Sequence, residues 1–375
     1  MKKILFIVNV DWFFISHRLS IAEIAMQNGY EVHIATTITT KLDLLINAGL
    51  IVHPINIHRS NGGLISVFRE LIQLVILIRS VSPDIVHLVT IKPVLLGGIA
   101  ARINSTSSVV SSVSGLGFVF TQEGYYAKFV KKIAAILYRL SFNHKNLMVI
   151  FQNKDDKLKL MRLTRLTEKR TTIIDGSGVN LSLFSRKPLP DGLPVVMMAS
   201  RLLADKGVRE FVLAAKQVRL AFSSVRFVLV GEVDVLNPSS VKQEEVDLWK
   251  KEGVVEVWGG SDNMAATLSK ATIVILPSYR EGFPKVLIEA AACGRAVITT
   301  NVPGCRDAIK SEITGLLVPV KSARALSNAT LDLLKNPDKC KQMGDAGRKL
   351  SEEKFDIKQV TKRHMRIYRD LIRDV

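Results

Sequence analysis

The stretch TIVILPSYREGFPKVLIEAAACGRAVITT, residues 272–300, contains a complete strand–helix–strand repeat. It opens with one apolar run of strand length, and its last residues, from 296 on, begin a second one that extends to 302. Between them, Pro284 suits the first turn of a helix, and Gly294 follows an alanine-rich segment as a helix-closing glycine does. Two strands joined by a helix pair in parallel, so this stretch predicts an α/β fold.

The same alternation extends over nearly the whole chain. Short apolar runs predict strands at 4–10, 31–37, 51–57, 84–90, 108–114 and 147–153, and again at 195–201, 225–231, 254–260, 272–278 and 296–302. Segments with helical spacing separate them, and a linker rich in Gly, Ser and Pro interrupts the pattern at 173–194. We therefore predict two doubly wound, Rossmann-like domains that face each other across a cleft.

The expected domains are an N-terminal one over residues 1–178 and a C-terminal one over 179–355. A last amphipathic segment, 356–375, predicts a basic helix that packs back on the N-terminal domain. Open parallel sheets bind ligands beyond the carboxyl ends of their strands. Functional residues should therefore follow the predicted strands.

The composition indicates a globular protein, with 47% hydrophobic and 23% charged residues among 375. No apolar run approaches the roughly 18 residues that a membrane-spanning helix needs. Asp11 cuts short an N-terminal apolar run that otherwise imitates a signal peptide. The three cysteines lack metal-ligand spacing and are too few for a disulfide framework, so we expect a cytoplasmic protein.

The net charge of +18 predicts an acidic partner. Residues 121–170 contain twelve Lys or Arg and four Asp or Glu, a local net charge of +8. This segment is either a solvated helix surface or a patch that faces an anionic membrane. Nucleic acid is the less favoured partner, because no zinc-finger, arginine–glycine or aromatic pattern accompanies the charge.

Residues of the second half follow strands in the expected way. Arg201 is the last residue of the predicted strand at 195–201 and Lys206 follows five residues later, where two cations near a helix start could bracket a phosphate. An ordinary surface loop explains them equally simply. Gly231 and Glu232 end a second strand, where glycine permits close approach of a ligand to the backbone, and Trp258 belongs to a third.

Two glutamates, Glu281 and Glu289, flank the start of the predicted helix. If all eight intervening steps were helical, the two residues would lie roughly 12 Å apart and about 80° apart around the axis. Carboxylates accept hydrogen bonds from hydroxyls, and a helix start between them suits a phosphate. This outline fits a nucleotide sugar, with a hexose, a diphosphate and a ribose. The alternatives are a first-turn glutamate at 281 and a structural buried carboxylate at 289.

These elements together resemble glycosyltransferase family 4, the retaining nucleotide-sugar transferases of GT-B fold. The matching segments are SRLLADKG (200–207), VGE (230–232), VWGG (257–260) and PSYREGFPKVLIEAAACGRAVITTNVPGCRDAI (277–309). The resemblance covers nearly the whole chain, and its most specific part is the family's pair of glutamates separated by seven residues. It implies that Glu281 holds the donor sugar and Glu289 the ribose.

The resemblance also implies that Arg201 and Lys206 stabilise the leaving diphosphate. The backbone amides of Gly282 and Phe283 would lie near the sugar and the β-phosphate. Positively charged groups at a departing diphosphate supply the main electrostatic help. Because no Asp-x-Asp pair is present, we expect a metal-independent enzyme that uses no cofactor besides the nucleotide-sugar donor.

The first half is similar to the family branch that builds lipid-linked oligosaccharides and O-antigen units, including N-acetylgalactosaminyltransferases. The matching segments are WFFISHRLSIAEIA (12–25) and SGLGFVF (114–120), which contain Gly115 and Gly117. Many family members carry a histidine where this chain has Ser114 and Gly115. His17 is an alternative residue to meet the reacting sugar, or a packing residue.

Trp12, Phe13 and Phe14 directly follow the first strand and should lie at the mouth of the cleft. Aromatic side chains beside a basic segment are typical of a membrane-interface anchor. The alternative is that they pack on the next helix. The hypothesis places the protein on the inner face of a bacterial plasma membrane, acting on a polyprenyl-diphosphate-linked sugar.

The sequence thus predicts a retaining glycosyltransferase that moves a hexose or N-acetylhexosamine, most simply from a UDP-sugar, in surface-polysaccharide assembly. Two other functions stay open at this point. A sugar-nucleotide epimerase could share the architecture and would turn over its nucleotide sugar without an acceptor. A non-catalytic nucleotide-sugar-binding assembly protein would bind the donor and transfer nothing.

Overall fold

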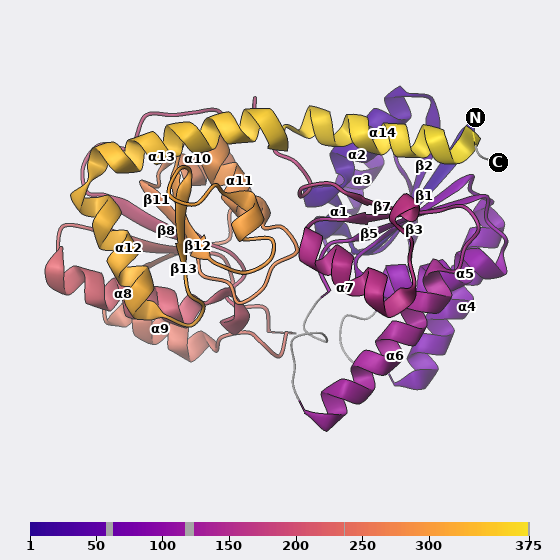
Figure 1. The fold of residues 1–375 in the computed structure, drawn as a ribbon, viewed down its shortest axis with the longest axis horizontal. Helices are drawn as coiled ribbons and strands as arrows, with labels where there is room; N and C mark the ends of the chain where they lie inside the picture. Colours follow the sequence, from indigo (N-terminus) through magenta and orange to yellow (C-terminus); the bar gives the residue numbers. More distant parts are fainter. Residues whose placement is uncertain (58–62, 117–123, 236, 374–375) are drawn as a thin grey trace. The chain divides into compact units, whose positions relative to one another are not determined.

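The chain divides into two compact units. A computed structural model describes residues 1–57, 63–116, 124–235 and 237–373 (Figure 1). Unit 1 comprises Met1–Ser177 and Lys358–Val375, and unit 2 comprises Gly178–Ile357. Unit 1 is therefore built from two separate stretches of sequence.

Unit 1 contains a seven-stranded parallel sheet in the order β3-β2-β1-β4-β5-β6-β7. Its strands are β1 (Lys2–Val10), β2 (Tyr30–Thr37), β3 (Ile51–Pro54), β4 (Ile85–Val89), β5 (Ser108–Val113), β6 (Leu147–Phe151) and β7 (Thr171–Ile173). Its helices are α1 (Asp11–His17), α2 (Leu19–Gln27), α3 (Leu42–Asn47), α4 (Leu64–Val81), the π-helix η1 (Pro93–Gly97), α5 (Gly98–Ile103), α6 (Tyr125–Phe142), α7 (Lys154–Thr164), the short η3 (Glu168–Arg170) and α14 (Ile357–Arg373).

Unit 2 contains a six-stranded parallel sheet in the order β10-β9-β8-β11-β12-β13. Its strands are β8 (Val195–Ala199), β9 (Arg226–Val230), β10 (Glu256–Gly259), β11 (Ile273–Leu276), β12 (Ala296–Thr300) and β13 (Gly315–Val318). Its helices are η4 (Ala204–Lys206), α8 (Val208–Ala221), α9 (Gln243–Lys251), α10 (Met264–Ser269), α11 (Lys285–Ala292), η5 (Arg306–Ala308), α12 (Ala323–Lys335), α13 (Pro337–Leu350) and η6 (Ser351–Phe355).

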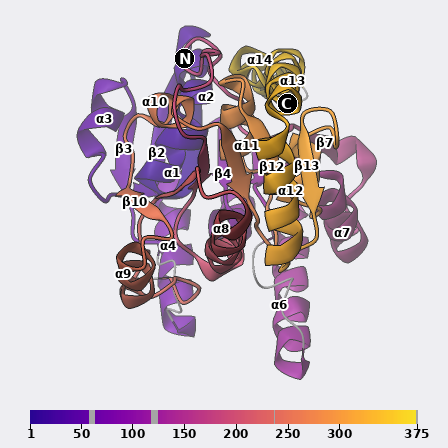
Figure 2. The same cartoon turned by 90° about the vertical axis from the view of Figure 1, so that its left-hand side faces the viewer.

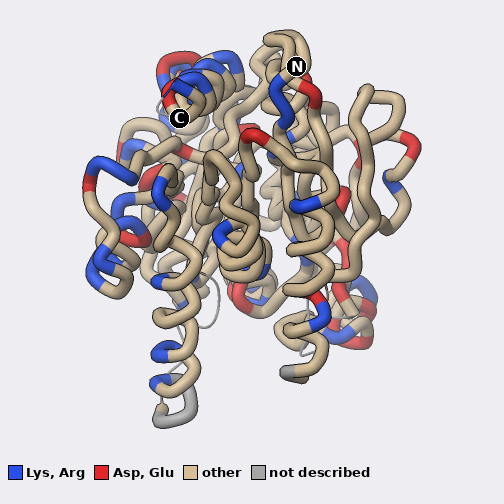
Figure 3. Tube along the Cα trace, turned by 90° about the vertical axis from the view of Figure 1, so that its right-hand side faces the viewer, with Lys and Arg blue, Asp and Glu red and all other residues tan. Residues whose placement is uncertain are grey.

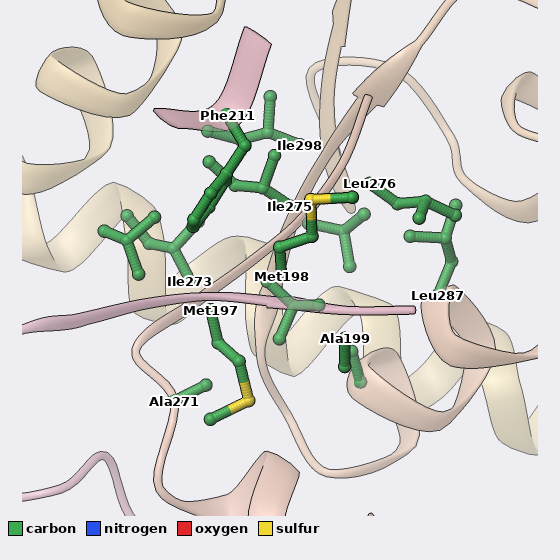
Figure 4. Packing of buried hydrophobic residues seen from close by; sticks show 14 of the residues in the cluster. Met197, Met198, Ala199, Phe211, Ala271, Ile273, Ile275, Leu276, Leu287 and Ile298 are labelled. Atoms are coloured by element: carbon green, nitrogen blue, oxygen red, sulfur yellow. The ribbon is translucent and has the colours of Figure 1, made fainter. Parts of the chain in front are cut away.

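Most strands are mainly apolar because both faces of each sheet are covered. In β1, Leu5 and Ile7 join the core beneath α4, α5 and α6, whereas Phe6 points the other way, with its ring 5.5 Å from Phe14 of α1. In unit 2, Met197 and Met198 of β8 lie in one continuous core with neighbouring strands and helices (Figure 4). The predicted doubly wound α/β architecture is confirmed in each unit.

Two strands were not predicted, β7 and β13. Each is three or four residues long and lies at an edge of its sheet. Runs this short carry too little periodicity to be separated from loops. Each is recruited by pairing with a longer neighbour, β6 or β12.

The C-terminal helix α14 packs on the sheet of unit 1. The Tyr368 hydroxyl lies 2.5 Å from Nδ1 of His87 on β4, and Asn146 Nδ2 donates to the Leu371 carbonyl at 2.7 Å. Figure 2 shows α14 at the opposite end of unit 1 from the free ends of α4 and α6. Residues 358–373 thus complete the second face of a sheet that begins at residue 2.

In each sheet the strand order reverses beside the first strand, between β1 and β4 and between β8 and β11. Loops leaving the carboxyl ends of such strands diverge to opposite faces and leave a crevice. These two edges are where ligand-binding side chains are expected.

Candidate active site

The loops after β8, β9 and β11 meet at the carboxyl edge of the unit 2 sheet. The Tyr279 amide donates to the Asp205 carbonyl at 2.8 Å, which joins the β11 and β8 loops. Gly231 has a φ of +141°, and a Cβ there would lie 1.8 Å from the Ser200 carbonyl oxygen. Only glycine allows the β9 end to approach the β8 end this closely.

Lys206 and Glu281 form an ion pair at this edge. Lys206 ends the short helix η4, and the Ser278 hydroxyl donates to Oε1 of Glu281 at 2.7 Å. Both charged side chains are largely buried, yet neither is sealed from solvent. The structure therefore brings together two of the three residues predicted to be catalytic.

Arg201, the third predicted catalytic residue, is also ion-paired. Its guanidinium donates to Oδ2 of Asp234 at 2.8 Å, and the arginine side chain remains exposed. The loops after β8 and β9 carry the two partners, so this pair also lies at the carboxyl edge. Asp234 was not predicted, because its distance from Arg201 in sequence gave no signal.

Glu289 lies inside α11 and is only 6% exposed. Burial raises the pKa of the Glu289 carboxyl, and the ion pair with Lys285 opposes this shift without cancelling it. Lys285 also lies 5.7 Å from the centre of the Phe184 ring. Sequence reasoning missed Lys285, although its place four residues before Glu289 on one helix is a detectable signal.

The estimate of the distance between Glu281 and Glu289 assumed helix over all the steps between them and is wrong in that respect. α11 begins only at Lys285, after Pro284 in extended conformation, so half of the span is a turn. The chain at Gly282 is packed tightly, because a Cβ on Gly304 would lie 2.5 Å from the Gly282 carbonyl oxygen. The Phe283 ring is buried in the core against Phe355, so only the backbone of Phe283 is available to a ligand.

The remaining two donor-side candidates differ in placement. Glu232 follows Gly231 directly, and Gly260 leaves room for its carboxylate, since a Cβ there would lie 2.9 Å from Oε1. The Trp258 indole instead donates to Glu256 at 3.0 Å and lies beside Arg226, at the starts of β10 and β9. The structure does not bring the Trp258 side chain to the other candidates.

In unit 1, the segment after β1 forms α1 and is not an exposed aromatic cluster. Phe14 is fully buried, which corrects the expectation that it faces lipid. Trp12 and Phe13 are half-buried, and the Phe13 ring stacks on His17 at a centroid distance of 4.1 Å. His17 therefore packs against its own helix, with Nδ1 3.2 Å from the Phe13 carbonyl oxygen.

The end of β5 lies close to the same edge of unit 1. Gly115 has a φ of +129°, and the Ser114 hydroxyl accepts a hydrogen bond from the Arg18 guanidinium at 3.4 Å. Gly117 lies outside the described residues. Arg18 is buried, and burial lowers the pKa of its guanidinium to about 10.

Thr90, which the sequence did not single out, directly follows β4 at the switch point of unit 1. Its φ is +74°, and its buried Oγ1 has no hydrogen-bond partner among the described residues. A β-branched residue rarely adopts this backbone conformation, and such strain gathers at functional sites. Only the fold could identify it, since a threonine after a strand carries no sequence signal.

Comparison with known protein families identifies the family of this chain. Residues 182–350 match the family described as glycosyl transferases group 1, and residues 3–153 match glycosyl transferase 4-like. The two matches lie in unit 2 and unit 1, respectively. The chain is a glycosyltransferase.

Curated relatives of the glycosyltransferase include enzymes of lipid-linked sugars. A Campylobacter jejuni N,N'-diacetylbacillosaminyl-diphospho-undecaprenol α-1,3-N-acetylgalactosaminyltransferase is 29% identical over 82% of this chain and 83% of that protein. An Escherichia coli UDP-Gal:α-D-GlcNAc-diphosphoundecaprenol α-1,3-galactosyltransferase is 28% identical over 72% and 71%.

Solved structures share the fold of the glycosyltransferase. Sucrose-phosphate synthase from Thermosynechococcus elongatus matches over the whole of both chains, with a TM-score of 0.83 at 21% identity. The predicted GT-B fold is thereby confirmed. The enzyme assignment also decides against the epimerase and the non-catalytic alternatives.

Two further observations concern the possible metal-ligand and thiol side chains in the described part of the glycosyltransferase. No group of three or more His, Cys, Asp or Glu gathers there as a metal site. Cys293, Cys305 and Cys340 are buried and free, and burial raises the pKa of each thiol, that of Cys305 to about 12. These thiols are therefore core side chains.

Proposed function

We propose that the glycosyltransferase moves a hexose or N-acetylhexosamine from a UDP-sugar to a polyprenyl-diphosphate-linked sugar, with retention of anomeric configuration. The acceptor would be an intermediate of bacterial surface-polysaccharide or glycan assembly. The enzyme would act from the cytoplasm, peripherally bound to the anionic inner face of the plasma membrane, with no nucleic acid as partner.

One observation carries the acceptor class. The Campylobacter jejuni relative aligns over four-fifths of both proteins, and its name describes a diphospho-undecaprenol-linked acceptor. The Escherichia coli relative, aligned over about seven-tenths, is named for an acceptor of the same chemistry. The two names differ in the transferred sugar, so the proposal commits to the lipid diphosphate and leaves the hexose to experiment.

The unit 2 site supports the donor class. Lys206 and Glu281 are in direct contact, which suits adjacent parts of one donor, because the sugar and the diphosphate share a bond. In the proposed complex, Lys206 and Arg201 face the diphosphate, Glu281 the sugar hydroxyls and Glu289 the ribose. UDP is preferred over GDP because the Escherichia coli relative is named for UDP-Gal.

The chemistry requires charge separation along one bond. When the bond from the anomeric carbon to the diphosphate breaks, positive charge grows on the sugar and negative charge on the departing oxygen. Preorganised cations beside that oxygen lower the barrier more than any other single term. Lys206 and Arg201 supply them here, so the proposal requires no metal ion.

Retention follows from the expected linkage. Both relatives are named for α-1,3 linkages, and the common UDP-hexoses are themselves α-anomers. An α-linked product would therefore keep the donor's configuration. The proposal names no side chain as a covalent nucleophile.

The test is a product assay with synthetic polyprenyl-diphosphate-linked N-acetylglucosamine and bacillosamine acceptors. Each acceptor is incubated with a panel of UDP- and GDP-sugars, and the lipid products are identified by mass spectrometry and by NMR of the anomeric proton. We expect one sugar to be added, from a UDP donor, with an α-linkage. Donor hydrolysis or epimerisation without lipid product, under all conditions, would refute the proposal.

A matched pair of variants links the activity to the site. Lys206→Ala removes a cation from the proposed diphosphate site and should lower kcat about 10²- to 10³-fold. Lys216→Ala removes a lysine that is ion-paired with Glu252 on the surface of unit 2, and should change kcat less than about twofold. Equal losses in the two variants would mean that Lys206 is structural.

A further inference from the structure

Two helices of unit 1, α4 and α6, carry apolar side chains on their outward faces. On α4 these are Ile65, Phe68, Ile72 and Ile76, which are 43–72% exposed. On α6 they are Phe129, Ile133, Ile136 and Leu140, which are 42–61% exposed. The spacings of three, four and seven residues place each set in a single stripe along its helix.

The opposite faces of both helices are buried in the core of the same unit. Leu74 and Ile78 of α4 and Tyr138 and Phe142 of α6 belong to one hydrophobic cluster. A surface helix normally has one apolar stripe and a polar outer face. α4 and α6 each have two apolar faces, and only one of them is buried among the residues that the structure describes.

The two helices are placed to act together. Both pack against η1 and α5, which lie between them on one face of the sheet. Their N-terminal ends extend in the same direction beyond the sheet of unit 1 (Figures 2 and 3). A groove of about 530 Å³ between α4 and β3 adjoins the α4 stripe and is lined in part by Ile72 and Ile76.

Positive charge borders the stripes. Lys128, Lys132 and Arg139 lie at roughly 60–100° from Phe129 around the α6 axis, on one flank of the stripe. The α6 sequence contains no Asp or Glu, and Figure 3 shows Lys and Arg along its protruding part. The one acidic residue of α4, Glu70, is only 4% exposed and is ion-paired with Lys92.

We propose that the outward stripes of α4 and α6 form the surface that docks on an anionic lipid bilayer. Apolar side chains would enter the headgroup–acyl boundary, and the flanking cations would meet lipid phosphates, as in amphipathic helices that lie in the membrane plane. No helix in the described residues is long and apolar enough to cross a bilayer. The inference rests on the proposed function only in that a polyprenyl-linked acceptor lies in the same bilayer.

The charge favours lipid over a second copy of this chain. A two-fold contact through these faces would bring the α6 cations of both copies together without acidic partners. An anionic bilayer complements both features at once. The surface also replaces the Trp12–Ile15 segment as the expected anchor, because the aromatic side chains there are buried or half-buried.

The experiment measures binding to vesicles of phosphatidylglycerol and phosphatidylcholine by co-sedimentation. One variant combines Ile65→Ser with Phe68→Ser on α4, and a second combines Phe129→Ser with Ile133→Ser on α6. The matched control combines Leu213→Ser with Leu220→Ser, two exposed leucines on α8 of unit 2. Circular dichroism checks that every variant is folded, and all are assayed with a water-soluble short-chain acceptor.

We expect wild type to bind anionic vesicles, and to bind more weakly to neutral vesicles or in high salt. Each of the α4 and α6 variants should lose at least about tenfold in affinity, since two apolar side chains that would enter the bilayer are removed, while the control stays within about twofold. Activity on the short-chain acceptor should stay within about twofold in all variants, because neither stripe belongs to the candidate site.

Three results would overturn the docking surface. One is unchanged vesicle binding by the α4 and α6 variants, and another is an equal loss in the α8 control. The third is a wild-type dimer without lipid that the α4 and α6 variants convert to monomer, which would assign the face to a second copy. Absence of transfer to any acceptor by wild type, with vesicle binding intact, would instead refute the proposed function alone.

Discussion

At the scale of single residues, the unit 2 site consists of cations held by carboxylates. Arg201 with Asp234, Lys206 with Glu281 and Lys285 with Glu289 are three such pairs at one region of the fold. Each carboxylate holds a cation in place, and in the proposed donor complex the preset positions of Arg201 and Lys206 would reduce the reorganisation that diphosphate binding requires. The sequence identified one or both members of each pair, but it did not identify the pairing.

Glu289 gives the sharpest residue-scale prediction. If its carboxylate holds the ribose, Glu289→Gln should weaken UDP binding about 10- to 100-fold, because a charged hydrogen-bond acceptor is lost. UDP at about a hundred times its dissociation constant should raise the free energy of unfolding of the wild type by roughly 2.7 kcal/mol. Isothermal titration and thermal melts measure both, with Glu252→Gln on the surface as the control.

The raised pKa of Glu289 also predicts that UDP affinity depends on pH. Burial raises the pKa of Glu289, so the carboxylate takes up its proton at a higher pH than an exposed glutamate does. As the pH is lowered, the UDP affinity of the wild type should therefore begin to fall while the pH is still above 4.5, the ordinary pKa of a glutamate. Glu289→Gln cannot titrate and should not show this fall. Parallel affinity profiles for the two proteins would rule out contact between Glu289 and the nucleotide.

At the scale of elements, the ends of β8, β9 and β11 depend on glycines that let backbones touch. Gly231→Ala should lower the free energy of unfolding by about 2–4 kcal/mol, because the new Cβ meets the Ser200 carbonyl and φ is positive. Gly253→Ala has positive φ but open space and should cost about 1 kcal/mol. Urea unfolding compares them, and equal costs would mean that the β8–β9 contact is not tight in solution.

Element prediction succeeded where periodicity is long and failed where it is short. Every strand of five or more residues was expected near its observed position, because a run of apolar residues buried on both faces is a local signal. β7 and β13 are short, and neighbours at a distance in the sequence create them. The late start of α11 likewise depends on the turn at Gly282, which packs on Gly304.

At the scale of the whole molecule, the histidines are distributed unevenly. All seven lie in unit 1 or its C-terminal segment, and unit 2 contains none. Burial lowers the pKa of His364 to about 3 and holds that of His87 well below its usual range. Arg18, buried beside both rings, adds to each shift.

This distribution predicts that acid destabilises unit 1 before unit 2. Below pH 6.5 the unfolded chain binds a proton at His364 and at His87 that the folded unit does not bind, so stability is lost as pH falls. Well below pH 6.5 the loss should approach about 1.4 kcal/mol per pH unit for each histidine. Hydrogen exchange resolved by peptide measures the stability of unit 1 as a function of pH, with unit 2 as the internal control. His364→Gln should reduce the dependence of unit 1 stability on pH.

The sequence by itself determined the two α/β units, the order of their elements and the strand ends that carry the candidate donor-side residues. These follow from local periodicity, glycine positions and one specific glutamate spacing, all of which are properties of neighbouring residues. The tertiary structure alone decided which cation meets which carboxylate, that Phe14 is core and that Thr90 is strained. It also decided that α4 and α6 keep a second apolar face uncovered. The physical reason is that pairing and burial depend on residues far apart in the chain, whose meeting no local pattern encodes.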